Sequence, residues 1–363
     1  MTVRVGLLGT GFIARYHAMQ LDLADEPNEL TAVLDLDRAR AESFLTDRGV
    51  TDHGVAGHGV AGHGAAVVDD VVELVERSDA VFVCTWTADH LASVRAVVDA
   101  GLPVFCEKPL STDLSSAREL VRAVERSGVP NMVGLVLRSS PALLALRELV
   151  RRPESGAVMN VVFRDDQYLP TQGMYGSTWR GDPDLAGSGA LLEHSIHDVD
   201  ILEWLLGDAV SVAAQQSHFH GIDHIEDSVS ALFRFGSGAT ATLASVWHDV
   251  LSRPSQRRIE VFCERALVTL EGDVFGPVRV QDSDGELVLD GDGLVTWLRE
   301  RAVRLVSAEQ EFLVAVRERL DGGRPERLRP DVHDALRAHE LVDAVYRSAG
   351  SDGAAVAVPP RSA

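Results

Sequence analysis

Apolar residues follow two different patterns along this chain, and the first pattern occupies residues 1–137. Runs that are apolar at nearly every position alternate there with stretches whose apolar residues recur at a helical period. The apolar runs are 3–9, 29–36, 80–86, 103–108 and 131–137, and the helical stretches are 11–24, 37–49, 69–78, 90–101 and 115–128. Strands that are apolar on both faces and alternate with helices are typical of a parallel sheet covered on both sides. Residues 1–137 therefore predict an α/β domain.

The pattern changes after residue 138, where apolar and polar positions alternate in shorter strands separated by turn sequences. A helix (141–152), a strand (158–169) and a loop rich in Gly, Pro, Thr and Ser (170–189) come first. Later strands are expected at 210–219, 227–235, 239–249, 258–264, 266–271 and 277–289, and closing helices at 295–321 and 331–349. This order predicts an α+β domain over residues 138–363 with a large, mainly antiparallel open sheet. Its last helix is a candidate to pack back on the first domain.

Composition and charge narrow the class of protein. The chain has 363 residues, which suits two domains, and 45% of them are hydrophobic, so a large core can form. A net charge of −21 argues against binding to nucleic acid or to an anionic membrane surface. No apolar run approaches the ~18–20 residues of a membrane span, and the N-terminus shows no signal-peptide pattern. Cys84, Cys106 and Cys263 lie far apart in apolar runs, which favours buried free thiols and a cytoplasmic location.

The pentapeptide GVAGH occurs twice, at 54–58 and 59–63, and histidines stand at positions 53, 58 and 63. A metal-binding tract would need further ligands, and no cysteine or carboxylate stands at ligand spacing. We therefore interpret this segment as a flexible loop and expect no metal.

The turn after the first strand, Gly9-Thr-Gly11-Phe-Ile-Ala14, has the pattern G-x-G-x-x-A. Because it follows a strand and opens a helix, it indicates the dinucleotide-binding turn of a Rossmann domain. Gly9 would permit the tight turn, Gly11 would let the backbone approach a pyrophosphate, and Ala14 would allow close helix–strand packing. Asp35, 21 residues beyond Ala14, stands where a carboxylate accepts hydrogen bonds from the adenosine ribose. We expect NAD rather than NADP, because Asp35 would repel a 2′-phosphate and the nearest arginine is Arg38.

A second signal is the sequence VFCEKPLS at 104–111, which places Glu107-Lys108-Pro109 after a predicted strand. Open parallel sheets bind ligands at the carboxyl ends of their strands. Lys108 is the only lysine in a chain with 34 basic residues, which suggests a need for a compact ammonium group. A lysine at this position can donate a hydrogen bond to a substrate hydroxyl or carbonyl oxygen.

The stretch 190–207 is predicted as one amphipathic helix with five ionisable side chains in its first half. They are Glu193, His194, His197, Asp198 and Asp200. At ~100° per residue, His197 and Asp200 lie ~40° and ~20° to either side of Glu193, so these three share one face. His194 and Asp198 lie on an adjacent stripe, ~100–140° away.

The turn G-x-G-x-x-A, the sequence CEKPLS and the stretch AGSGALLEHSIHDVDILEWLLGD together resemble the glucose-fructose oxidoreductase / inositol dehydrogenase family. The resemblance covers essentially the whole chain, including IEDS at 225–228 and FGSGATATLASVW. Members of this family are mostly NAD(P)-dependent dehydrogenases of sugars and cyclitols. The resemblance implies a cis peptide bond between Lys108 and Pro109. It also implies that the open sheet of the second domain is an oligomerisation surface, so we expect a homodimer or homotetramer.

The resemblance further implies a catalytic group of Lys108, His197 and Glu193. Oxidation of a secondary alcohol sends a hydride to the nicotinamide and needs a base for the proton, a task that suits histidine. Glu193 would hold the imidazole of His197, and Lys108 would share the proton relay. The family has Asp where this chain has Glu193, and the extra methylene would move the carboxylate by about 1 Å.

The other expected contacts form two sets. Substrate contacts are expected at Asp200, Arg138, Asp166 and Arg180. Cofactor contacts are expected at Gly9, Gly11, Phe12, Ile13, Asp35, Thr85, His90, Glu107 and Lys108.

We interpret the chain as a cytoplasmic NAD-dependent dehydrogenase that acts on a secondary alcohol of a sugar, cyclitol or amino sugar. Two alternatives stay open: a catalytically silent NAD(P)-sensing regulator and an NAD-dependent redox glycosidase. A zinc site is disfavoured, because the nicotinamide pattern makes a metal unnecessary. Its ligands would come from Glu193, His194 and His197, or from His218, His220 and His224.

Overall fold

The computed structural model describes residues 1–47 and 64–361, and it shows two compact units. The first unit comprises Met1–Gly134 and Val306–Leu336, and the second comprises Leu135–Leu305 and Arg337–Ala363. The repeated GVAGH segment, with the histidines at 53, 58 and 63, lies outside the described residues.

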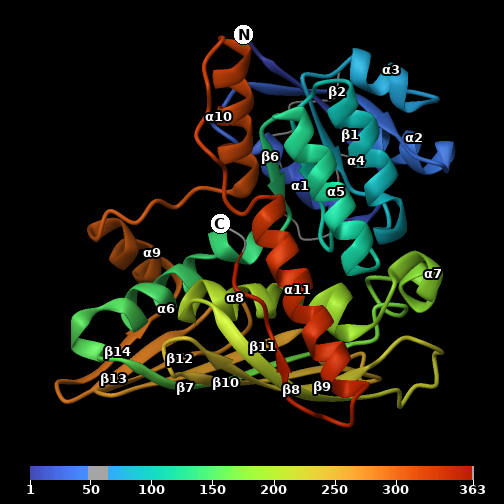
Figure 1. The fold of residues 1–363 in the computed structure, drawn as a ribbon. Coiled ribbons are helices and arrows are strands. Elements are labelled where there is room, and N and C mark those ends of the chain that lie inside the picture. The colour runs from blue at the N-terminus through green and yellow to red at the C-terminus, as the bar shows by residue number, and fades with distance from the viewer. Residues whose placement is uncertain (48–63, 362–363) are drawn as a thin grey trace. The chain divides into compact units, whose positions relative to one another are not determined.

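The sheet of the first unit is parallel at each pairing between its described strands (Figure 1). The strand order is β3-β2-β1-β4-β5-β6, so the direction of winding reverses between β1 and β4. The strands are β1 (Val3–Leu8), β2 (Asn28–Leu34), β3 (Ala66–Val67), β4 (Ala80–Val83), β5 (Val104–Cys106) and β6 (Asn131–Val133). This is the order of the dinucleotide-binding Rossmann fold, in which ligands bind at the carboxyl ends of the strands beside the reversal. The predicted Rossmann domain is confirmed.

Helix start and stop signals in the sequence explain the layers around this sheet. The helices are α1 (Phe12–Asp22), α2 (Arg38–Asp47), α3 (Val71–Glu76), α4 (His90–Asp99) and α5 (Leu114–Ser127). The carboxylates of Asp70 and Asp113 accept hydrogen bonds from the backbone N–H of Glu73 and Ser116, so they cap the N-termini of α3 and α5. Helix α5 ends at Gly128, whose φ of +64° is left-handed.

A segment from late in the chain completes the first unit. Helix α10 (Ala308–Leu320) packs on α1 and against β1 and β6. Its Phe312 is fully buried and meets the rings of Phe82 and Phe105 edge-on. Residues 306–336, which were predicted to belong to the second domain, lie in the first unit.

The single helix predicted over 295–321 is wrong, because the structure has two helices there. Helix α9 (Gly291–Glu300) belongs to the second unit and α10 to the first. The chain leaves helical geometry at Ala302, whose φ is +56°. The apolar residues between the two helices keep a nearly helical spacing, so their pattern alone does not reveal the break.

The sheet of the second unit is mainly antiparallel, as predicted. Its strand order is β14-β13-β12-β11-β7-β10-β9-β8-β15, and among the described strands β7 and β10 form the parallel pair. The strands are β7 (Val158–Tyr168), β8 (Ala209–Ser217), β9 (Ser228–Phe235), β10 (Thr240–His248), β11 (Gln256–Cys263), β12 (Ala266–Leu270), β13 (Val278–Asp282), β14 (Gly285–Leu289) and β15 (Val356–Ala357). The single strand predicted over 277–289 is wrong, because the structure has a hairpin of β13 and β14 there. Ser283 and Asp284 form its turn, and β14 begins at Gly285, whose φ is +126°.

Helices cover one face of this sheet. They are α6 (Pro141–Arg151), α8 (Ile196–Leu206) and α11 (Val332–Ala349), and α7 (Pro183–Ala186) lies in the loop before α8. Alternate strand residues such as Phe163, Phe233 and Ile259 are at most 1% exposed and form a core with apolar residues of these helices. In Figure 1 the other face of the sheet has no helix over it.

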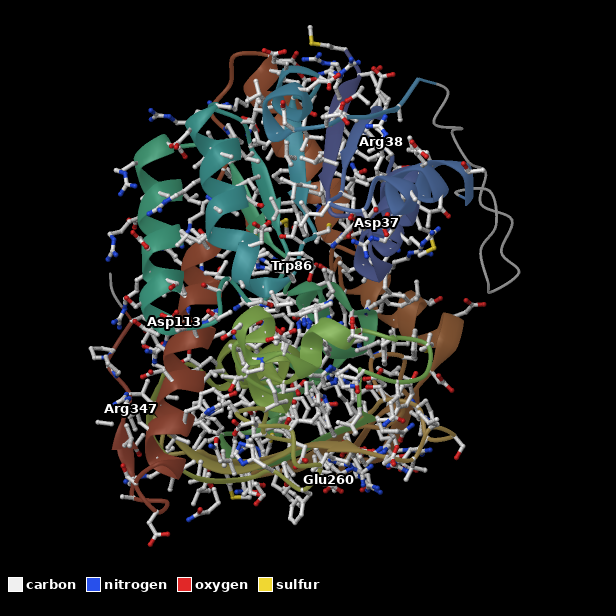
Figure 2. All side chains as sticks on the ribbon, turned by 90° about the vertical axis from the view of Figure 1, so that its right-hand side faces the viewer. Asp37, Arg38, Trp86, Asp113, Glu260 and Arg347 are labelled. Carbon is white, nitrogen blue, oxygen red and sulfur yellow. The ribbon has the colours of Figure 1, made fainter. Side chains whose placement is uncertain are left out.

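The uncovered face carries a mixture of apolar and charged side chains. Val162, Leu232 and Phe262 are 39%, 45% and 38% exposed, and Glu260 of β11 lies on the same face (Figure 2). Apolar side chains on an uncovered sheet face are shielded from water when that face packs against another surface.

Two further findings bear on the class of protein. Cys84, Cys106 and Cys263 are buried and free, as predicted. Among the described residues, no helix is long and apolar enough to cross a membrane.

Candidate active site

The phosphate turn of the first unit leaves room for a ligand at the N-terminus of α1. Gly9 has φ +90°, and a side chain there would meet the carbonyl oxygen of Cys84 at 2.6 Å. Gly11 is the N-cap of α1, and a Cβ on it would have no heavy atom within 4 Å. The first helical residues, Phe12 and Ile13, are partly or largely exposed, whereas Ala14 is fully buried. An open helix N-terminus fits the pyrophosphate of a dinucleotide.

Asp35 lies at the carboxyl end of β2 and is fixed by the turn itself. Its Oδ2 accepts hydrogen bonds from the backbone N–H of Thr10 at 2.8 Å and from the Thr10 hydroxyl at 2.7 Å. Burial is the largest single influence and opposes ionisation of this carboxyl, but the hydrogen bonds from Arg40, Asp37 and Thr10 together hold the pKa of Asp35 below its ordinary value. A negative charge is therefore present where the adenosine ribose is expected.

The arginine beside Asp35 is Arg40 and not Arg38, which corrects the expectation from the sequence. Arg40 donates to Asp35 Oδ1 from Nη2 at 2.6 Å and to Oδ2 from Nε at 3.1 Å. Arg38, at the start of α2 (Figure 2), pairs with Glu42 and Asp69 instead. Arg40 stands in the first turn of α2, so its side chain can reach back to the end of β2.

His90 is buried between two backbone carbonyl groups. Its Nδ1 lies 2.7 Å from the oxygen of Pro109, and its Nε2 lies 3.1 Å from the oxygen of Thr85. The ring therefore ties the end of β4 to the turn after β5. The expected contacts of Thr85 and His90 with the cofactor stay predictions.

The turn after β5 contains Glu107, Lys108 and Pro109. The Lys108–Pro109 peptide bond is cis, as predicted. Glu107 is only 5% exposed, and one of its oxygens accepts a hydrogen bond from the backbone N–H of Lys108 at 3.2 Å. Lys108 itself is partly exposed. The sequence motif thus combines a buried carboxylate with a more accessible ammonium group.

The stretch predicted as one helix in the second unit begins with a different geometry. Residues Ala190–His194 form a single π-helical turn, and α8 starts after Ser195. The backbone N–H of Ser195 donates to the carbonyl of Ala190 at 2.9 Å, which is the longer π-type bond. The prediction of a continuous α-helix over 190–207 is therefore wrong at its N-terminal end.

Glu226 explains why the chain is held in this way at the start of the turn. Its side chain accepts hydrogen bonds from the N–H of Gly189 at 2.6 Å and of Leu191 at 2.9 Å. Its backbone carbonyl accepts from the N–H of Ala190 at 2.8 Å. The approach is so close that a Cβ on Gly189 would lie 1.9 Å from that carbonyl oxygen. Glu226 thus satisfies the N–H groups that a helix N-terminus leaves unpaired.

The π turn changes the relation between the expected catalytic residues. The ~100° spacing used for Glu193 and His197 assumes an unbroken α-helix, so that angle does not apply across the turn. His197 and Asp200 both lie in α8 and keep the helical relation of ~60°. Such π turns occur frequently at functional sites.

Glu193 is 2% exposed and pairs with Arg180 from the loop before α7. The Arg180 Nε lies 3.3 Å from Glu193 Oε2, and its Nη1 donates to Ser177 Oγ at 2.6 Å. The guanidinium also lies over the ring of Trp179, 4.3 Å from the ring centre. The structure thus brings together two residues that the sequence analysis expected at the site, Glu193 and Arg180.

Two other expected substrate residues pair with each other. The carboxylate of Asp200 accepts hydrogen bonds from Arg138 Nη2 at 2.5 Å and from Nε at 2.8 Å. Their side chains are 3% and 10% exposed, so the pair is well shielded from water. A two-pronged pair of this kind fixes both groups in direction.

Asp166, the remaining expected substrate residue, is paired with arginines. Arg253 Nε donates to its Oδ2 at 2.5 Å, and Arg164 Nε lies 3.0 Å from Oδ1. Burial is the largest single influence and opposes ionisation of Asp166, but the hydrogen bond from Arg253 and the charges of Arg253 and Arg164 together lower the pKa of Asp166. Arg253 was not predicted as a site residue, because no motif marks it and its partner lies 87 positions away.

His194 and Asp198 lie in a buried charge cluster around Arg257. Arg257 Nε donates to Asp198 Oδ1 at 2.8 Å, and its Nη2 lies 3.2 Å from Asp165 Oδ2. His194 Nε2 contacts the same Asp165 at 3.0 Å. Burial raises the pKa of Asp198 to about 8, against the opposing charge of Arg257. This cluster fastens the π turn and the start of α8 to β7 and β11.

Arg257, which is 5% exposed, was likewise not predicted as a site residue. It stands opposite Asp165 in the antiparallel register of β11 and β7. Only the register brings these charges together, and a single sequence does not reveal the register. Within the described part of the chain, no group of three or more His, Cys, Asp or Glu residues is arranged to hold a metal ion.

Comparison with known proteins agrees with the class that the fold defines, a dinucleotide-binding protein with a second α+β unit. Residues 3–135 match the model of an oxidoreductase family with an NAD-binding Rossmann fold, and residues 143–269 match the GFO/IDH/MocA C-terminal domain. A 1,5-anhydro-D-fructose reductase from Ensifer adhaerens is 31% identical over 69% of each of the two chains. The chain therefore belongs to the GFO/IDH/MocA family of NAD-binding oxidoreductases.

Other relatives extend the similarity to most of the chain. An inositol 2-dehydrogenase from Cereibacter sphaeroides is 34% identical over 57% of this chain, a match that spans 55% of that protein. An inositol 2-dehydrogenase from Rhizobium meliloti is 28% identical over 96% of this chain and 97% of that protein. The structure of a levoglucosan dehydrogenase in complex with NADH has the same fold, with a TM-score of 0.80 at 19% identity. That similarity covers 99% of this chain and 100% of the other.

Proposed function

We propose that the chain is an NAD-dependent dehydrogenase that acts in the cytoplasm on a secondary alcohol of a sugar, cyclitol or amino sugar. The observation that carries the proposal is the start of α8, where the buried carboxylate Glu193 precedes the partly exposed imidazole of His197. The names of the relatives support the substrate class, because inositol and 1,5-anhydro-D-fructose are both polyhydroxylated rings.

Each protein group has a task in this proposal. Bound NAD supplies the nicotinamide ring that accepts the hydride. His197 takes the proton of the alcohol, because imidazole is a base near neutral pH. Lys108 donates a hydrogen bond to the same oxygen and shares the proton relay. Glu193 stabilises the imidazolium that forms on His197. Because Glu193 is paired with Arg180, this stabilisation is weaker than an unpaired carboxylate would give.

The paired charges in the second unit fit the recognition of ring hydroxyl groups. The Arg138–Asp200 pair offers a fixed set of donors and acceptors, and so does Arg253 with Asp166. A hydroxyl group can donate to a carboxylate and accept from a guanidinium, so such pairs bind a polyol without a net charge.

Activity is tested with the purified full chain, NAD or NADP, and a panel of cyclitols, aldoses, 1,5-anhydrohexoses and amino sugars. We expect NADH absorbance to appear with NAD and at least one ring polyol. Tight NAD binding without turnover of any panel member would instead support the sensing regulator. Release of an aglycone without net NADH would support the redox glycosidase.

Variants of the proposed base test the mechanism. We expect His197→Asn to lower kcat by roughly 10²–10⁴, which is the usual range for loss of a general base, and to leave NAD affinity nearly unchanged. The rise of the oxidation rate with pH through neutrality should vanish in this variant. His224→Asn is the matched control, because the His224 side chain is 78% exposed. A kcat near that of the wild type in His197→Asn would show that the helix is structural.

Lys108→Met should lower kcat in a similar way. The double variant should be less impaired than the product of the two single effects, because both groups are proposed to serve one oxygen and one proton path. Fully multiplicative effects would contradict the shared path.

We also propose that the uncovered face of the nine-stranded sheet, with Val162, Leu232 and Phe262, is the surface on which the chain forms a homodimer or homotetramer. Leu232→Asp should shift the mass measured by light scattering toward the monomer, because a charge would be buried in an apolar contact. An unchanged mass in this variant, or a monomeric wild type, would contradict the proposal.

A further inference from the structure

A histidine in the first unit is buried between two carboxylates that belong to distant parts of the chain. His17, on α1, is 0% exposed. Its Nε2 lies 2.8 Å from Glu107 Oε1, and its Nδ1 lies 2.7 Å from Glu309 Oε1. The side chains of the two carboxylates are 6% and 1% exposed. Neither His17 nor Glu309 has a part in the roles proposed above.

The number of N–H donors that the two contacts need indicates the protonation state of His17. An ionised carboxylate only accepts hydrogen bonds, and a neutral imidazole has a single N–H to donate. With both carboxylates ionised, the two short contacts can both be hydrogen bonds only if each ring nitrogen of His17 carries a proton. Burial alone would lower the pKa of His17, but its hydrogen bonds with Glu107 and Glu309 raise it to about 9. The contact with His17 in turn keeps the pKa of Glu107 low despite burial.

The carboxylate of Glu107 is confined on its other sides as well. Its second oxygen accepts the backbone N–H of Lys108 at 3.2 Å. Gly134, after β6, faces it so closely that a Cβ there would lie 2.1 Å from Glu107 Oε1. Glu107 thus occupies the space that any side chain at position 134 would need. The orientation of the turn after β5 is therefore determined by the partners of this one carboxylate.

The same imidazole holds α1, whose N-terminus forms the phosphate turn. His17 lies in the second turn of that helix, and Gly11 caps its start. Glu309 stands in the first turn of α10, so the second carboxylate partner of His17 comes from the segment that returns to the first unit. One buried ring therefore links the phosphate turn, the Glu107-Lys108 turn and α10.

We propose that His17 is a positioning residue of the NAD site, which as an imidazolium holds Glu107 and α1 in the geometry that binds the dinucleotide. When His17 loses a proton, it can donate to only one of its two partners. The other carboxylate is then buried without its hydrogen bond, which is unfavourable. NAD affinity should therefore fall as the pH rises through the ionisation of His17.

Among the ionisable groups around His17, the tyrosine and the two thiols stay uncharged in this range because burial raises their pKa values. The facing ionisable groups are Tyr16 on α1, Cys84 after β4, Cys106 on β5, Glu107 and Lys108 in the turn, and Glu309 on α10. Burial raises the pKa of Tyr16 to about 12. Burial also raises the pKa values of the Cys84 and Cys106 thiols well above the ordinary value. Phe82 and Phe105 complete the surroundings of the ring.

The test is the pH dependence of NAD binding, measured by calorimetry with the full chain between about pH 7 and 10, where histidine with a raised pKa titrates. The wild type should keep its NAD affinity at neutral pH. Its affinity should then fall roughly tenfold in the alkaline part of the pH curve, which we call the alkaline limb. Glu309→Gln keeps an acceptor for Nδ1 but removes a negative charge. It should therefore move the limb to lower pH by roughly one unit or more. Glu318→Gln is the matched control, because Glu318 is exposed on the same helix.

Two further measurements separate positioning from a merely structural role. His17→Gln should bind NAD more weakly at neutral pH and show no alkaline limb. The ring nitrogens of His17, followed by ¹⁵N NMR, should titrate near the pH of the binding limb in the wild type and earlier in Glu309→Gln. An unmoved limb in Glu309→Gln, or a limb that persists in His17→Gln, would overturn the proposal. Since the readout is NAD binding without substrate, its failure is distinguishable from failure to find a dehydrogenase activity.

Discussion

Gly189→Ala is a direct test of how the start of α8 is built. Gly189 has φ −101° and ψ −132°, so its φ is not in the left-handed region, and the main effect of the change is the contact made by the new Cβ. The new Cβ would lie 1.9 Å from the carbonyl oxygen of Glu226 and 2.7 Å from its carbonyl carbon. Since real Cβ atoms do not approach within 3.0 Å, the two segments must separate by about 1 Å.

The expected magnitude follows from the hydrogen bonds that this separation would stretch. Glu226 accepts from Gly189 at 2.6 Å, from Ala190 at 2.8 Å and from Leu191 at 2.9 Å. N···O distances about 1 Å longer are no longer hydrogen bonds. Loss of two or three of them beside a buried carboxylate costs about 2–5 kcal/mol. The melting temperature should fall by roughly 5–15 °C, because 1 kcal/mol corresponds to about 2–4 °C in domains of this size.

Turnover should fall further than stability alone explains, since a displacement of about 1 Å at a catalytic group can lower the rate by about 10²-fold. The assays are calorimetric melting and kcat on the best ring polyol. Gly293→Ala in α9 is the control, because a Cβ there meets nothing within 4 Å. It should leave the melting temperature unchanged or raise it slightly. A Gly189→Ala protein that melts within about 1 °C of the wild type with full kcat would refute the reasoning.

The remaining predictions concern the cofactor and the thiols. The wild type should prefer NAD to NADP by at least about tenfold, because contact of Asp35 with a 2′-phosphate costs roughly 1–3 kcal/mol. In Asp35→Ala the preference for NAD should become smaller, because Arg40 loses its carboxylate partner and can pair with the 2′-phosphate of NADP. Equal affinity of the wild type for NAD and NADP in a binding titration would contradict the predicted preference. Cys84, Cys106 and Cys263 should resist iodoacetamide in the native protein and react after unfolding, because burial raises their pKa values. Mass spectrometry checks this, and rapid labelling of the native protein would count against it.

The Rossmann domain could be predicted from the sequence because its signals are local. Its strands are apolar on both faces, and the Gly9 and Gly11 turn lies between a strand and a helix. The antiparallel sheet was predictable for a similar reason, since its strands alternate with a period of two. The break between α9 and α10 was not, because the change at Ala302 is a single residue with positive φ in a stretch of helical spacing.

The candidate site was only partly predictable, because its charges are paired by tertiary contacts. Glu193 and Asp200 lie in the helix motif, and the structure shows that they form ion pairs with Arg180 and Arg138, which were also expected at the site. Arg257 carries no such signal, because it meets Asp165 only through strand register. The π turn also escapes a prediction based on periodicity, since the apolar spacing of 190–207 is compatible with an α-helix throughout.

The return of residues 306–336 to the first unit has a consequence for the synthesis of the protein. The Rossmann sheet is complete in the chain by Gly134, yet α10 and Glu309 follow only after the whole insertion up to Leu305. At ~5–20 residues per second, a ribosome needs roughly 10–30 s to reach them. During this interval His17 lacks the partner that stands 292 positions away, and the faces of α1, β1 and β6 that α10 covers stay open. The first 134 residues of the nascent chain therefore keep an apolar surface exposed until α10 has been synthesised.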